Sequence, residues 1–163
     1  MELCPGDFAE FSTVNYSADG KVTTKPSSIM VAIGPQGDFE QVGILSVIGD
    51  KVIGSQAVLY DLGKKRVDKG ELVAKGTEAL QIHGQSYECS WQKRRSGKVT
   101  TTFWRCPELP FEHLAKMIVE TAEGERQIVE LVYFGPPDEE TEESQKFQAR
   151  LSHLLKQLPD SKE

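Results

Sequence analysis

The stretch that decides the fold is Tyr87-Glu-Cys-Ser-Trp-Gln-Lys-Arg-Arg-Ser-Gly-Lys-Val-Thr-Thr-Thr-Phe-Trp-Arg-Cys-Pro107. It is typical of two strands that fold back on each other around a tight turn. A two-residue loop at Gly97-Lys98 favours a type II′ turn, which needs Gly at its first central position. The flanking residues Ser96 and Val99 then face each other across the hairpin.

The register that follows from this turn predicts which side chains meet. Counting outward places Trp91 opposite Trp104 and Cys89 opposite Cys106. Both pairs fall at non-hydrogen-bonded positions, where facing side chains lie closest, so two indoles can pack there and a cross-strand disulfide can close. The alternative is that both cysteines are small, buried, reduced side chains, as in most cytosolic proteins. Cys4 is left without a predicted partner.

Length and composition limit the class of protein. A chain of 163 residues is most simply one domain over residues 1–163. Hydrophobic content of 38% and charged content of 27% are typical of a globular protein in water. The net charge of −6 argues against nucleic acid as a partner. Apolar runs stay well short of the roughly 18 residues that cross a bilayer, so the chain is not expected to be transmembrane.

The N-terminus leaves the compartment open. Met1-Glu-Leu-Cys4 leads directly into Pro5-Gly-Asp7 without the apolar core of a secretory signal. This start fits a native cytosolic N-terminus, and it equally fits a mature secreted domain that was given a starting Met.

Short strands separated by turn signals fill residues 7–134. Gly49-Asp50, for example, is a two-residue hairpin loop of the preferred kind. Residues 126–134 are apolar on both faces, which predicts a strand at the centre of the sheet, covered on both sides. Residues 61–76 lack a period of two, and we interpret them as a loop with a helical turn over residues 71–75.

The C-terminal region has helical periodicity instead. An acidic first turn at residues 138–143 precedes an apolar stripe formed by Phe147, Leu151, Leu154, Leu155 and Leu158. This predicts an amphipathic helix over residues 138–158 that covers one face of the sheet, because an apolar sheet face needs a covering layer. The alternative is a partner-binding tail. The predicted fold is mainly β with α: a curved antiparallel sheet or half-barrel of about eight to ten strands covered by this helix.

Catalytic chemistry has no recognisable motif in this sequence. His83, His113 and His153 are scattered and lack metal-ligand spacing. Nothing near Cys89 supplies the helix N-terminus that usually activates a thiol. Phosphate-binding loops and nucleophile elbows are also missing. We therefore predict no catalytic residue, no metal site and no cofactor, and expect that the protein is not an enzyme.

One basic cluster stands out on this acidic chain. Lys93, Arg94, Arg95 and Lys98 surround the turn of the central hairpin. A cluster of this kind is a candidate contact for a phosphate or an anionic lipid. The alternative is a solvated turn whose charges protect against pairing between sheet edges.

Four stretches carry a resemblance to known proteins: Pro5-Gly-Asp-Phe-Ala-Glu-Phe11, Gly84-Gln-Ser-Tyr-Glu-Cys-Ser-Trp91, residues 104–116 and Glu130-Leu-Val-Tyr-Phe-Gly135. They are similar to the "PGDW-x-E-Y", "G-x-x-Y-x-C", "W-x-S-x-x-V-P-x-x-G-L-V-K" and "E-L-V-x-F-G" segments of uncharacterised secreted bacterial proteins. The chain departs from this pattern by having Cys106 in place of Ser and by its C-terminal helical extension.

These relatives look like the LolA and LolB lipoprotein carriers, in which a curved antiparallel sheet holds an apolar ligand against helices. The resemblance implies a non-enzymatic binding protein of the cell envelope, periplasmic or secreted, with a lipid or lipidated protein as partner. It assigns no ligand-binding residue. The alternative function is a protein–protein interaction or structural module that acts through a sheet edge or through the basic tip at residues 93–98. The alternative location is the cytoplasm.

Overall fold

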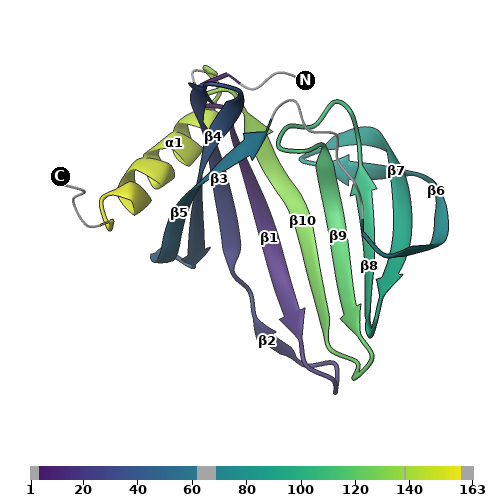
Figure 1. Ribbon diagram of the computed structural model, residues 1–163. Coiled ribbons are helices and arrows are strands. Elements are labelled where there is room, and N and C mark those ends of the chain that lie inside the picture. The colour runs from purple at the N-terminus through teal and green to yellow at the C-terminus, as the bar shows by residue number, and fades with distance from the viewer. Residues whose placement is uncertain (1–3, 62–68, 138, 159–163) are drawn as a thin grey trace.

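The computed structural model describes residues 4–61, 69–137 and 139–158 (Figure 1). Its elements follow the chain in the order β1 (Phe8–Tyr16), β2 (Val22–Thr24), β3 (Ser27–Gln36), β4 (Phe39–Ile48), β5 (Lys51–Asp61), β6 (Glu71–Ile82), β7 (Gln85–Ser96), β8 (Val99–Arg105), β9 (Leu114–Thr121), β10 (Arg126–Gly135) and α1 (Glu142–Leu155).

All ten strands belong to one antiparallel sheet. Its order is β5-β4-β3-β1-β10-β9-β8-β7-β6, and the short β2 pairs with β1 outside this path. The sheet is curved and does not close, and β6 and β7 bend away from the plane of the central strands (Figure 1). The predicted fold class is therefore confirmed.

The central hairpin has the predicted register. Trp91 pairs with Trp104, and Ser96 pairs with Val99. Gly97 adopts a φ of +62°, which the first central position of a type II′ turn requires. The short turn fixes the register here, since each residue of both strands can be counted from it.

The strand at residues 126–134 is central, as predicted, because β10 lies between β1 and β9. Its cover is less complete than expected. Leu131 is buried, whereas Val132 sits at a bulge opposite β1 and is 38% exposed. The bulge turns one apolar side chain toward solvent and interrupts the alternation.

The interpretation of residues 71–75 as a helical turn was wrong, because β6 begins at Glu71. The register of β6 against β7 shifts at Val73, so a bulge hides the period of two. Gly76 then lies against the indole of Trp91: a Cβ at this position would come within 2.9 Å of the ring. Residues 62–68 of the predicted loop lie outside the described residues.

The helix is shorter than the predicted 138–158. It begins after Thr141, whose hydroxyl oxygen accepts a hydrogen bond from the backbone N–H of Ser144 at 3.1 Å. This N-cap satisfies a donor that the first turn leaves unpaired, so the acidic residues before it stay outside the helix. Residues 138 and 159–163 are not among the described residues.

The helix covers one face of the sheet, as predicted. Phe147, Leu151 and Leu154 of α1 are buried against Phe8 and Ile29 of β1 and β3. The Phe8 and Phe147 rings stack with their centroids 4.0 Å apart. An ion pair between Arg150 and Glu10, 2.8 Å long, fixes the helix to β1 at the side of this core.

A second apolar core extends from β3 and β4 to the hairpin of β7 and β8. Trp104, Cys89 and Cys106 are buried in it. The connector between β8 and β9 adds Leu109 and Phe111, which are 0% and 5% exposed. The α1 side chains belong to the other core, so this connector, and not the helix, covers the second one.

Candidate functional site

The two hairpin cysteines lie together in the second core as unbonded thiols. Burial, followed by the neighbouring Cys106, raises the pKa of Cys89 to about 11. A thiol with this pKa stays protonated at neutral pH and is a poor nucleophile. The geometry therefore favours a structural role, and the Cys89–Cys106 disulfide stays a prediction. Cys4 is exposed.

The basic tip is not one cluster of free cations. Arg94 donates from Nε to Gln92 Oε1 at 2.9 Å and from Nη1 to the Gly70 carbonyl at 3.0 Å. Because strand neighbours point to opposite faces, Lys93 and Arg95 lie on the other side of β7 from Arg94. Lys98 is exposed in the turn. An anion contact at this tip stays a prediction.

The histidines occupy three separate places. His83, in the turn between β6 and β7, contacts the Glu143 carboxylate of α1 through Nε2, and its ring centroid lies 4.7 Å from that of Tyr133. His113 contacts the Leu109 carbonyl through Nδ1 at 3.0 Å, and His153 is on α1. Within the described ranges, no group of three His, Cys, Asp or Glu side chains is arranged to hold a metal.

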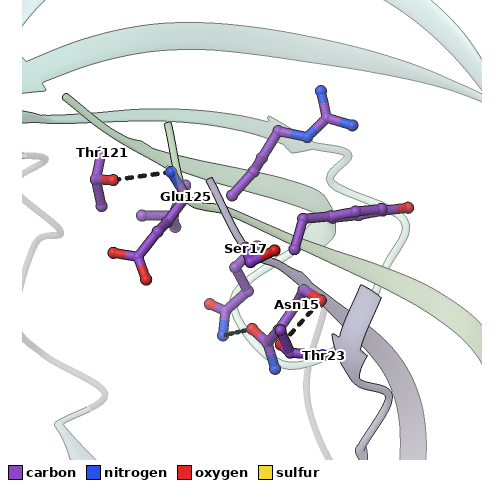
Figure 2. A pocket seen from close by; sticks show the side chains of 9 residues that line it. Asn15, Ser17, Thr23, Thr121 and Glu125 are labelled. Atoms are coloured by element: carbon purple, nitrogen blue, oxygen red, sulfur yellow. Dashed lines mark hydrogen bonds between the residues drawn. The ribbon is translucent and has the colours of Figure 1, made fainter. Parts of the chain in front are cut away.

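A cleft of about 310 Å³ opens where β1 and β9 end and β10 begins (Figure 2). Its lining is Asn15, Tyr16, Ser17, Thr23, Val119, Thr121, Glu125, Arg126 and Gln127. The sequence did not indicate this cleft, because its residues come from segments that are far apart in the chain and carry no motif.

The walls of the cleft are bonded to one another. Gln127 Nε2 donates to Asn15 Oδ1 at 2.9 Å, and the Thr23 hydroxyl donates to the Asn15 carbonyl at 3.2 Å (Figure 2). The Thr121 hydroxyl accepts from the Glu125 N–H at 3.1 Å. These bonds use polar groups that a ligand would need. The cleft is therefore better explained as the joint between two hairpin ends than as a binding site.

The two edges of the sheet differ in chemistry. β5, one edge, has no charged residue from Val52 to Tyr60. Its register against β4 shifts at Ile53, and Gly54 to Tyr60 then pair regularly with β4. Ile53 and Leu59 are 55% and 52% exposed. A long, uncharged edge strand is a template for pairing with another chain.

The free side of β5 can be located from the hydrogen bonds at its start. The side-chain amide of Gln157, just after α1, accepts from the Val52 N–H at 2.8 Å and donates to the Asp50 carbonyl at 2.6 Å. Val52 thus directs its peptide group away from β4. Because this direction alternates along a strand and Gly54 faces β4 after the bulge, Ser55, Ala57 and Leu59 direct theirs outward.

The opposite edge, β6, has the features that prevent edge pairing. Glu71, Lys75 and Glu78 place charges along it, and the bulge at Val73 interrupts its regular course. Charges and bulges are the usual means by which proteins protect an exposed edge. Among the described strands, the unprotected edge is therefore β5.

The second core keeps a partly exposed apolar border. Leu80, Tyr87 and Trp91 pack against it and are only partly buried. Burial, and next the carboxylate of Glu108, raises the pKa of Tyr87. This border lies on the bent part of the sheet, away from the α1 core.

Comparison with known proteins gives a fold likeness and no family. No protein-family model matches the chain, and no curated protein matches it. One similar solved structure is described as "Crystal structure of MucB". The match has 10% identity and a TM-score of 0.44, and it covers 85% of this chain but only 56% of that one. A likeness at this level carries no argument about function, and the resemblance to the LolA-like carriers stays a prediction.

The length and polarity of α1 bear on the membrane question. No helix in the described part of the chain combines the length and apolar character that crossing a bilayer requires.

Proposed function

We propose that this chain is a non-enzymatic binding protein that engages another polypeptide through the β5 edge of its sheet. The observation that carries the proposal is the uncharged run from Val52 to Tyr60. It belongs to the last strand in the sheet order of the described residues, so its outward peptide groups face away from the sheet. An extended segment added beside β5 gains main-chain hydrogen bonds, and the exposed Ile53 and Leu59 add apolar contact.

Two proline variants test this proposal. Ala57→Pro removes one outward N–H and leaves the bonds between β4 and β5 in place, because proline is tolerated on the free side of an edge strand. Ala79→Pro makes the same change at an exposed, outward position of the β6 edge and is the matched control. The tagged chain and both variants are used to capture partners from the lysate of its own source.

The expected result is a polypeptide that binds wild type and Ala79→Pro but not Ala57→Pro. Equal capture by all three would overturn the proposal. Loss on Arg94→Glu with Arg95→Glu, but not on Ala57→Pro, would move the contact to the basic tip.

A second candidate function is the binding of a lipid or another apolar ligand. The observation in its favour is the partly exposed border of Leu80, Tyr87 and Trp91 on the second core. Trp91 and Trp104 are the two tryptophans of the chain, and both lie on this side. Added oleate should therefore shift the tryptophan emission to shorter wavelength, and lipid should co-purify with the protein. Unchanged emission, together with lipid-free protein by mass spectrometry, would remove this candidate.

The location of the protein is part of the same proposal. An oxidising compartment, periplasmic or extracellular, is favoured by the hairpin register, which brings Cys89 and Cys106 into one buried core where a disulfide could close. Intact mass before and after reduction with alkylation measures whether Cys89 and Cys106 are bonded in air-oxidised protein. Two free thiols at these positions would count against an oxidising compartment.

A further inference from the structure

We infer that Gln157 caps the β5 edge: its side-chain amide takes the place of one residue of an added strand, and so ends any partner strand near Ser55. This inference rests on the proposed function, because it concerns what the same edge can bind. Gln157 lies just after Leu155, the last residue of α1. The end of the helix therefore decides which part of β5 is open to a partner.

The two hydrogen bonds of the Gln157 side chain reproduce the pairing of a parallel strand. The Asp50 carbonyl and the Val52 N–H flank Lys51 on the side of β5 that faces away from β4. One residue of an added parallel strand would donate to the former and accept from the latter. The Gln157 amide does both, donating from Nε2 at 2.6 Å and accepting at Oε1 at 2.8 Å. An added strand therefore finds these two groups occupied.

The open part of the edge begins beyond the bulge at Ile53. There Ser55, Ala57 and Leu59 direct their peptide groups outward, and their side chains are exposed. At about 3.3 Å per residue, a strand that pairs with this part needs only about five residues. A longer strand would have to continue past the bulge and displace the Gln157 amide. The edge is thus suited to a short extended segment.

The cap is coupled to the docking of α1. The Gln157 N–H donates to the Leu154 carbonyl at 3.0 Å, which continues the last turn of the helix. Leu158, the next residue, packs against the α1 core together with Val52. The Gln157 amide thus stays at β5 only while the end of α1 is docked. Undocking this end would lengthen the open edge without any change in β5 itself.

A contact that only stabilises the fold would behave differently from a cap. Loss of the Gln157 amide would then lower stability and leave strand binding unchanged or weaker. Loss of a cap instead frees two main-chain groups, and it strengthens the binding of a strand that is long enough to reach them. The sign of the change in affinity therefore separates the two roles.

Amide hydrogen exchange of the purified full chain, followed by NMR, tests the contact itself. We expect slow exchange at Val52 in the wild type and exchange about tenfold faster in Gln157→Ala, because the N–H loses its acceptor. The matched control is Gln145→Ala, which removes another exposed glutamine of α1 and should leave Val52 unchanged. Equal exchange at Val52 in wild type and Gln157→Ala would overturn the inference.

Two synthetic peptides test the effect of the cap on strand binding. Both alternate Val and Thr, one over about five residues and one over about ten, which match the open part and the full length of the edge. Methyl groups on alternate backbone nitrogens leave each peptide one side for pairing. By fluorescence anisotropy, wild type and Gln145→Ala should bind both peptides with similar affinity. Gln157→Ala should bind the longer peptide about tenfold more tightly and the shorter one as wild type does.

The outcomes separate this inference from the proposed function. If both peptides bind and Gln157→Ala gains no affinity for the longer one, the cap is overturned and the edge function stands. Binding that Ala57→Pro does not weaken, or no binding by any variant, would count against the edge function, and the cap would fall with it. Circular dichroism shows that each variant is folded.

Discussion

The indole N–H of Trp104 donates to Glu78 Oε1 over 2.7 Å, and so joins β8 to β6 across the intervening strand β7. Strands two positions apart in a sheet are separated by about 9.6 Å, and these two long side chains bridge that distance on the face that they share. The bond thus links β8 to β6 over the strand between them, and it connects the predicted indole pair to the β6 edge.

Removing the donor should break the hydrogen bond between Trp104 and Glu78. Trp104→Phe keeps an aromatic ring in the second core but leaves the Glu78 carboxylate without the indole N–H. We expect the free energy of unfolding to fall by about 1–3 kcal/mol, because a charged acceptor loses its hydrogen bond. Urea denaturation measures the change. Glu78→Gln keeps an acceptor and should cost less; a larger loss for Glu78→Gln would contradict this account.

Two adjacent leucines test how the helix covers the sheet. Leu154 is 0% exposed in the α1 core, whereas Leu155 is 48% exposed. Leu154→Ala should lower the free energy of unfolding by about 2–5 kcal/mol through lost burial and a cavity. Leu155→Ala should change it by no more than about 0.5 kcal/mol. Similar losses for both, measured by thermal and urea unfolding, would mean that the helix is rotated or detached.

The ion pair between Arg150 and Glu10 should stabilise the docked helix more than an ordinary surface pair does. Only 14% of the Glu10 side chain and 33% of the Arg150 side chain is exposed. A double-mutant cycle with Arg150→Gln and Glu10→Gln should give a coupling energy of about 1 kcal/mol.

The matched control for this cycle is the pair Lys146–Glu142, which is 3.2 Å long and has side chains 75% and 82% exposed. Its coupling should stay below about 0.5 kcal/mol. Equal coupling energies for the two pairs would show that burial adds nothing at Arg150.

The thiols should differ sharply in their reactivity. Cys4 is exposed, whereas burial raises the pKa of Cys89 to about 11 from 9.0. At pH 8 the Cys89 thiolate is then about a hundredfold scarcer than that of an ordinary thiol. Alkylation with iodoacetamide, followed by peptide mass spectrometry, should label Cys4 first. Equal rates for both in folded protein would contradict the buried position of Cys89.

The same shift makes stability depend on pH. The unfolded Cys89 thiol ionises near 9.0 and the folded one near 11, so the folded state holds its proton more tightly. The contribution to stability is present in full below pH 9 and is lost as the pH rises toward 11. Denaturation midpoints across this window measure the loss, and Cys89→Ala should make them less dependent on pH.

Local turn chemistry explains which parts of the fold were predictable. Gly97-Lys98 fixes the register of its hairpin, so the pairing of Trp91 with Trp104 follows by counting. The start of β6 was missed because the bulge at Val73 breaks the alternation that identifies a strand. A bulge is specified by pairing with the neighbouring strand, and that information is not local in the sequence.

The sequence predicted only the type of candidate site, a sheet edge, and not its position. A sheet edge was one of the alternatives, but the sequence did not indicate which strands would be outermost. That depends on β1 pairing with β10, which joins the first and last strands at the centre and leaves β5 and β6 at the ends. Gln157 on Val52 is a contact between residues 105 positions apart, and no local pattern predicts it.

The contact between Gly76 and the Trp91 indole links two positions in the evolution of this fold. Any side chain at 76 begins with a Cβ, which would meet ring atoms at 2.9 Å, so the indole must shift or shrink first. Homologues should therefore carry Gly with Trp, or a larger residue at 76 with a smaller one at 91, and seldom a mixture. This covariation would identify distant relatives even where the surrounding strands have lost all other similarity.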